Sequence, residues 1–178
     1  MPACFLWELS ALRRRSGKLL KILVDADSCP KDARELAQRR AEKLGIQAVF
    51  AANRRIPGIK EESMEICPRG DNSADDRIVE LAQSGDVVIS RDIPLAKRLI
   101  EKDIAVIDDR GRLFTRDNIN EMLSLRNFMV GLAENGLGTE RTANYGRKEL
   151  KNFADSLDRI LGRLAKKTIP PGTCSGSV

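Results

Sequence analysis

Between residues 21 and 108, short apolar runs alternate with segments whose apolar residues recur at helical spacing. The runs are four to six residues long, which suits buried strands. Strands are expected at 21–25, 47–52, 64–67, 86–90 and 104–108, and helices at 30–44, 73–84, 93–102, 117–134 and 146–165. The last two helices are expected to be amphipathic. This alternation predicts an α/β fold: a three-layer α/β/α sandwich with a mostly parallel central sheet.

Turn and cap residues support these boundaries. Pro30 and Pro94 suit the first turns of the helices that they begin, and Ser73 is a candidate N-cap. Gly45 and Gly85 follow the last apolar positions of two helices, where glycine commonly ends a helix. The predicted helices therefore stop before each following strand.

The body, residues 21–165, has the length of one domain. Residues 1–20 are expected to form an N-terminal extension, and the Pro/Gly/Ser-rich residues 166–178 a disordered tail. The formal net charge is +5, but the body holds 25 basic and 25 acidic residues, so the excess lies in these end segments. The isoelectric point is therefore weak support for a nucleic-acid partner.

The N-terminus is a poor signal peptide, because its basic cluster follows the short apolar part. The chain also has no apolar stretch of the roughly 20 residues that a membrane span needs. We therefore expect a cytoplasmic protein without a membrane partner.

The chain contains no histidine, and its four cysteines form no CxxC pair. These absences exclude Ser-His-Asp and Cys-His catalysis and argue against a structural zinc site. Cys29 is expected to be a buried structural thiol rather than a nucleophile. Chemistry must then rest on Asp, Glu, Lys, Arg, Ser or a bound ion.

Acidic residues gather where the predicted strands end. Asp25 and Asp27 follow the first strand, Asp92 follows the strand 86–90, and Asp75 and Asp76 begin the preceding helix. Ligands of parallel sheets bind beyond the carboxyl ends of the strands, where the strand order reverses. Clustered carboxylates repel one another, and a divalent cation relieves this cost. An all-oxygen ligand set suits Mg²⁺ or Mn²⁺, which can orient a phosphodiester and activate water.

Each acid also has a structural interpretation. Asp75 and Asp76 would be favourable in the first turn of a helix, and Asp92 is a plausible N-cap. Asp108 and Asp109 suggest a turn. Asp25 and Asp27 are harder to explain by capping or solvation, since both lie close to a buried strand.

Four motifs, "VDADSCP", "DNSADDRIVE", "GDVVISRDIPLA" and "LSLRNFM", closely resemble the YaiI/YqxD family of uncharacterised bacterial proteins. The resemblance extends over residues 21–165, and this family is regarded as PIN-like. It implies metal-binding and catalytic roles for Asp25, Asp75 and Asp92, with Asp27 and Asp76 as further metal ligands. It also implies a Mg²⁺- or Mn²⁺-dependent nuclease whose partner is RNA.

Basic residues and one hydroxyl follow the same strand ends. Arg54 and Arg55 lie after the second strand and Arg91 after the fourth, which ends at Ser90. The resemblance implies that Ser90 is the small hydroxyl residue beside the site. We expect these four residues to contact the substrate at the rim of the acidic cleft.

Two other functions fit the same residues. "ILVDADSC" also resembles the start of haloacid-dehalogenase-type phosphatases, in which Asp25 would be the nucleophile and Asp27 the general acid. Ser90, Lys97 or Lys102, and Asp108/Asp109 follow in the order that this mechanism needs. The other possibility is a PIN-like domain that binds RNA or protein without catalysis.

Overall fold

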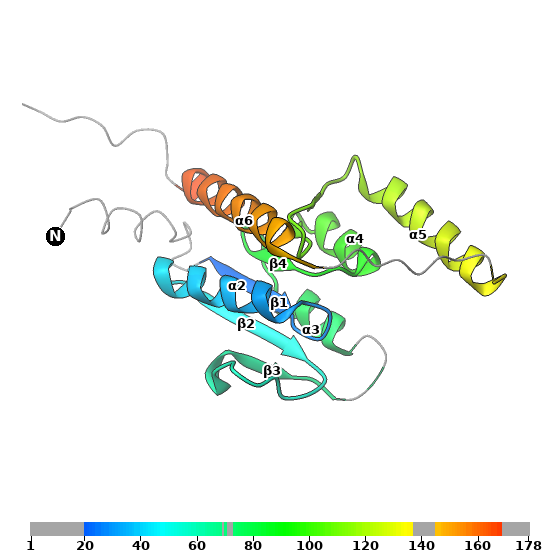
Figure 1. The fold of residues 1–178 in the computed structure, drawn as a ribbon. Helices are drawn as coiled ribbons and strands as arrows, with labels where there is room; N and C mark the ends of the chain where they lie inside the picture. The colour runs from blue at the N-terminus through cyan, green and yellow to red at the C-terminus, as the bar shows by residue number, and fades with distance from the viewer. Residues whose placement is uncertain (1–19, 69, 71–72, 137–144, 169–178) are drawn as a thin grey trace, which may run out of the picture.

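The computed structural model describes residues 20–68, 70, 73–136 and 145–168 (Figure 1). The predictions for residues 1–19 and 169–178 fall outside this part of the chain. In chain order the elements are β1 (Lys21–Asp25), α2 (Lys31–Leu44), β2 (Gln47–Ala52), the 3₁₀ turn η1 (Glu61–Ser63), β3 (Met64–Ile66), α3 (Ser73–Leu81), β4 (Val87–Ile89), α4 (Ile93–Glu101), β5 (Ala105–Ile107), β6 (Leu113–Phe114), α5 (Ile119–Glu134) and α6 (Arg147–Thr168).

The strands form one sheet in the order β3-β2-β1-β4-β5-β6. All neighbouring pairs are parallel except β5 and β6, which are antiparallel. This arrangement confirms the predicted α/β sandwich. The chain moves outward from β1 to β3 and then returns to β4 on the other side of β1. The strand order therefore reverses between β1 and β4, where the carboxyl ends of the strands leave a crevice.

Two hydrophobic cores lie on the two faces of the sheet. Successive side chains of a strand point to opposite faces, so Ile22 and Val24 face one core and Leu23 faces the other. The first core is covered by α2 and α6, with Phe153 and Leu157 fully buried. The second lies beneath α3 and α4. Burial on both faces explains why β1 is apolar from Ile22 to Val24.

Gly45 ends α2 as predicted. Its φ angle is 62°, in the left-handed region that glycine adopts without a steric cost. Its N–H donates to the carbonyl of Glu42 at 3.2 Å. This turn sends the chain directly into β2.

Several features differ from the sequence predictions. Helix α3 ends at Leu81, before its predicted end at residue 84, and β3, β4 and β5 are one or two residues shorter than expected. The two-residue strand β6 was not predicted. Helix α6 continues to Thr168, past the predicted end at residue 165. Helix α5 was expected to be amphipathic, but Ile119 is its only buried residue, and Figure 1 shows the helix extending away from the sheet.

Within the described ranges, no helix is both long and apolar enough to cross a membrane.

Candidate functional site

A cavity of about 460 Å³ opens at the carboxyl ends of β1, β2 and β4, beside the first turn of α3. This is the predicted reversal point of the sheet. The cavity is lined by Asp25, Asp27, Ser28, Asn53, Ala74, Asp75, Arg91 and Asp92. Four of the five predicted metal ligands therefore share one cavity, together with one of the predicted arginines.

Asp25 ends β1 and is held by two hydroxyl groups. Its Oδ2 accepts hydrogen bonds from Ser28 Oγ at 2.6 Å and from Ser90 Oγ at 3.0 Å. Ser90 Oγ in turn accepts from the Asp92 N–H at 3.0 Å. Because Ser90 is buried behind Asp25, it orients this carboxylate rather than facing the cavity.

Asp92 combines the two interpretations that its sequence position allowed. It is the N-cap of α4, and its Oδ1 accepts from the Leu95 N–H at 2.7 Å. The residue also lines the cavity. A carboxylate has two oxygens, so one can cap the helix while the other faces a ligand.

Asp75 lies in the first turn of α3 and is partly buried. The pKa of its carboxyl is raised to about 6, first by burial and then by the negative charges of Asp92 and Asp25. The positive charge of Arg98 opposes this rise. Asp92 and Asp25 therefore lie close enough to Asp75 to disfavour its charged form. Their proximity is the electrostatic condition under which a cation would bind.

Asp27 connects two loops at the edge of the cavity. Its Oδ2 accepts from the Asn53 N–H at 2.7 Å, and its Oδ1 lies 3.6 Å from Arg54 Nε. Arg54 is thereby placed beside the cavity, although it is not among the residues that line it.

Four of the predicted site residues do not line the cavity: Ser90 and Arg54, described above, and Asp76 and Arg55. Asp76 is exposed and pairs with Arg98 at 2.7 Å. Arg55 pairs with Glu61 at 3.4 Å on the surface. Asp76 therefore fits its structural interpretation, a carboxylate in the first turn of a helix.

Ser28 and Asn53 line the cavity but were not predicted. Asn53 directly follows β2, so the rule that ligands bind beyond the carboxyl ends of parallel strands could have identified it. Ser28 lies three residues after Asp25, within the motif that drew attention to the acids.

The acids are close but do not form a closed metal cage. In the part of the chain that the structure describes, no three Asp, Glu, Cys or His side chains converge on one point where they could hold an ion. Asp71, which the sequence suggests is a loop residue shortly before Asp75, lies outside the described residues. Mg²⁺ retains several waters and often binds through one or two carboxylates, so Asp25, Asp75 and Asp92 fit such an ion better than an ion enclosed by protein ligands.

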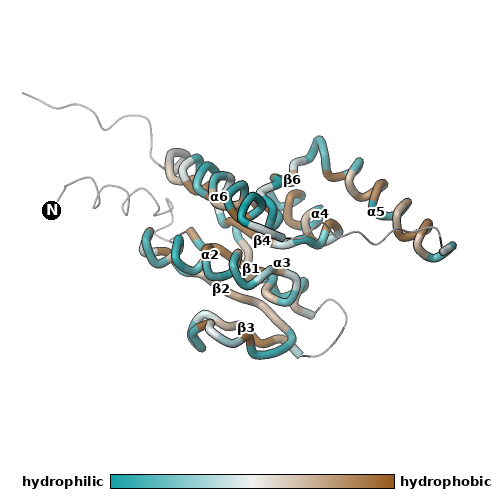
Figure 2. The backbone as a smooth tube through the Cα atoms, in the orientation of Figure 1, coloured by the Kyte–Doolittle hydropathy of each residue, from teal (hydrophilic) through white to brown (hydrophobic). Residues whose placement is uncertain are grey.

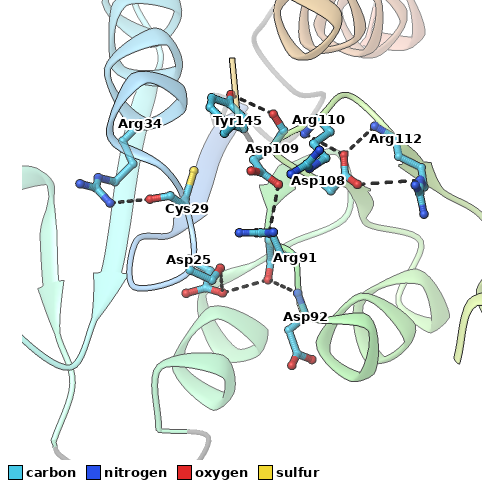
Figure 3. A network of polar contacts seen from close by, with 12 residues as sticks. Asp25, Cys29, Arg34, Arg91, Asp92, Asp108, Asp109, Arg110, Arg112 and Tyr145 are labelled. Atoms are coloured by element: carbon cyan, nitrogen blue, oxygen red, sulfur yellow. Dashed lines mark hydrogen bonds and ion pairs between the residues drawn. The ribbon is translucent and has the colours of Figure 1, made fainter. Parts of the chain in front are cut away.

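Cys29 is buried beside this site, as predicted for a structural thiol. Burial, followed by the charge of Asp109, raises the pKa of its thiol to about 12. The protonated thiol is a poor nucleophile. The carbonyl of Cys29 accepts from Arg34, which also donates to the carbonyl of Ala26 at 3.0 Å (Figure 3).

The fold and the cavity together define a class: an α/β sandwich with a carboxylate-lined crevice at the reversal point of its sheet. The sequence model of the YaiI/YqxD family, a family described as uncharacterized, matches residues 23–163. The chain therefore belongs to this family.

The chain is similar to bacterial proteins that are all named UPF0178 protein. It is 47% identical to one from Treponema denticola over 148 residues, which cover 83% of this chain and 96% of the relative. It is 45% identical to one from Treponema pallidum, covering 83% and 84% of the two chains. A third, from Pseudomonas putida, is 40% identical over 83% of this chain and 99% of its own. No solved structure matches the chain.

Proposed function

We propose that the protein is a Mg²⁺- or Mn²⁺-dependent nuclease that hydrolyses phosphodiesters of RNA at this cavity. The observation that carries the proposal is the gathering of Asp25, Asp75 and Asp92 in one cavity, where burial and then the negative charges of Asp92 and Asp25 raise the pKa of Asp75. A divalent cation would relieve this repulsion. RNA is proposed as the substrate because the motifs resemble PIN-type nucleases.

The residues of the cavity would bind the cation, the attacking water and the phosphate. One or two of the carboxylates of Asp25, Asp75 and Asp92 would bind the cation directly, and the others would contact its bound waters. Asp25 and Asp92 are each fixed by hydrogen bonds. The cation would polarise the phosphodiester and lower the pKa of a bound water. Asp27 and Arg91 line the same cavity, where Asp27 would accept a hydrogen bond from such a water and Arg91 would contact a phosphate oxygen.

The test is cleavage of a labelled single-stranded RNA by the purified full chain with Mg²⁺ or Mn²⁺. We expect Asp25→Asn and Asp92→Asn each to lower the cleavage rate at least about 100-fold, because each removes a charge that binds the cation. Chelation of the metal should stop cleavage of the same RNA by the unsubstituted chain.

Asp76→Asn is the matched control. It makes the same chemical change in the same helical turn as Asp75, but outside the cavity. The control should cleave at the unsubstituted rate. Cleavage that survives both Asp25→Asn and Asp92→Asn would falsify the proposal.

A phosphatase that uses Asp25 as its nucleophile is the competing proposal, because Asp25 and Asp27 line the same cavity. That mechanism also needs a lysine near the nucleophile. No lysine is among the described residues that line the cavity, and Lys102 Nζ donates to the carbonyl of Val79 instead. Release of phosphate from small monoesters, without cleavage of RNA, would reverse the ranking.

A non-catalytic binding domain is the remaining alternative. It predicts RNA binding by the purified chain that does not depend on a divalent ion and is accompanied by no cleavage.

A further inference from the structure

Asp109 is a buried carboxylate with an unusual set of neighbours. Its side chain is 1% exposed, and neither carboxylate oxygen accepts a hydrogen bond. Arg91 Nε lies 3.3 Å from Asp109 Oδ1, within the range of an ion pair but outside hydrogen-bond geometry. A buried carboxylate is costly unless it is paired, so Arg91 is the partner that compensates it.

The position of Asp109 is fixed by the turn between β5 and β6. Asp108 Oδ1 accepts from the N–H groups of Arg110 and Arg112 at 2.9 and 2.7 Å. The hydroxyl of Tyr145 donates to the carbonyl of Asp109 at 3.0 Å (Figure 3). The turn is therefore tied both to itself and to the segment that precedes α6.

Gly111 allows the backbone of the same turn to pack closely against α6. Its φ angle is +88°, and a Cβ at this position would lie 2.5 Å from the backbone oxygen of Asn152. No other residue type allows the backbone of the turn to approach α6 so closely. Because the turn is held in place, Arg91 must adapt to Asp109 rather than the reverse.

Arg91 lines the acidic cavity and also contacts the buried Asp109. Its sequence neighbours are Ser90, which supports Asp25, and Asp92, and its own side chain lines the cavity at 40% exposure. A guanidinium has five N–H donors, so contact through Nε leaves the terminal groups available for another acceptor. It is the one arginine among the described residues that line this acidic cavity.

We propose that Asp109 is a positioning residue: it holds Arg91 at the cavity so that the guanidinium binds a phosphate of the substrate. The phosphate belongs to the RNA of the proposed function, on which this inference rests. Arg91 supplies the attraction for an anion that the surrounding carboxylates would repel, and Asp109 limits the orientations that its side chain can adopt.

The test is a double-substitution cycle on RNA binding by the full chain. Arg91→Ala, Asp109→Asn and the double variant are titrated with a fluorescently labelled single-stranded RNA. Ca²⁺ replaces Mg²⁺, and a gel verifies that the RNA stays intact. Arg91→Ala should weaken binding about tenfold, and the slope of log affinity against log salt should fall by about 0.7 for a single strand. Asp109→Asn should weaken binding less or equally.

The decisive result is the double variant. If Asp109 acts through Arg91, Asp109→Asn causes no further loss once Arg91 is alanine. An equal loss in both backgrounds, or unchanged binding by Arg91→Ala, overturns the inference. The matched controls are Arg116→Ala and Asp103→Asn, which break an exposed ion pair of 2.8 Å and should leave binding unchanged.

Two further measurements separate this inference from folding and from the proposed function. Arg91→Lys keeps the charge on an exposed side chain, but its single nitrogen cannot contact Asp109 and a phosphate separately, so this variant should bind RNA as weakly as Arg91→Ala. Full RNA binding by Arg91→Lys overturns the inference, even if Asp109→Asn fails to fold. Coupled binding without any cleavage under Mg²⁺ rejects the nuclease and retains the inference. RNA cleavage under Mg²⁺, combined with independent effects of Arg91→Ala and Asp109→Asn on binding, retains the nuclease and rejects the inference.

Discussion

At the scale of single residues, most site carboxylates also serve the fold. Asp92 caps α4, Asp27 accepts from the Asn53 N–H, and Asp25 accepts from two serines. These contacts leave each side chain in one defined orientation. Asp75 differs, because burial and two neighbouring acids raise its pKa to about 6. Its charge is a cost to the metal-free fold.

This cost predicts a pH-dependent gain from Asp75→Asn. A carboxyl whose pKa is raised from 3.8 to about 6 favours folding below about pH 4, and this contribution is lost as the pH rises through 6. With a chelator at pH 8, Asp75→Asn should therefore raise the free energy of unfolding by about 1 kcal/mol, after allowance for solvent screening. Urea denaturation should show the gain at pH 8 and little difference near pH 4.

Asp76→Asn provides the comparison, since it removes an exposed ion pair and should give no gain at either pH. A gain from Asp75→Asn that is the same at both pH values would contradict the explanation by charge.

At the scale of elements, the sequence predicts best where burial alone decides. The bounds of β1 and β2 were predicted to the residue, because each is an apolar run that ends at a turn or an acidic loop. Strand β6 could not be predicted, since two residues carry no pattern and depend on pairing with β5. The apolar residues of α5 lie around most of its circumference, so their spacing did not indicate which side packs.

The same distinction holds for the site. The gathering of Asp25, Asp75 and Asp92 at one cavity was predictable, because these residues follow strands or begin a helix in a regular topology. The pairing of Arg91 with Asp109 was not, because it joins two loops that only the folded sheet brings together.

The packing of α5 and α6 predicts that substitutions of two phenylalanines destabilise the protein to very different extents. Figure 2 shows α6 against the body and hydrophobic stretches on the extended α5. Phe153 of α6 is fully buried, whereas Phe128 of α5 is 63% exposed. Phe153→Ala should lower the free energy of unfolding by about 3–5 kcal/mol, and Phe128→Ala by less than about 0.5 kcal/mol. Urea denaturation at one pH measures both, and similar losses would show that α5 packs more tightly than the structure indicates.

At the scale of the whole molecule, a ligand that binds only the folded chain stabilises all of it. At a free Mg²⁺ or Mn²⁺ concentration 100 times the dissociation constant, the gain is about 2.7 kcal/mol. For a chain of this size, that corresponds to a rise in Tm of about 5–10 °C. A thermal melt with and without the ion, at matched ionic strength, measures this effect.

The rise in Tm should disappear in Asp25→Asn and Asp92→Asn and persist in Asp76→Asn, which lies outside the cavity. An equal rise in all three variants would place the ion elsewhere on the protein. The thermal melt needs no substrate, so it examines metal binding independently of cleavage.

The central place of β1 has a consequence for the motions of the site. This strand is paired on both sides, with β2 and β4, and is covered by both cores. Its amide hydrogens can exchange with water only through openings that disrupt most of the sheet, whereas α5 can open by itself. Asp25 thus belongs to a strand whose opening costs much of the free energy of unfolding. Fluctuations confined to α5 leave the position of Asp25 unchanged.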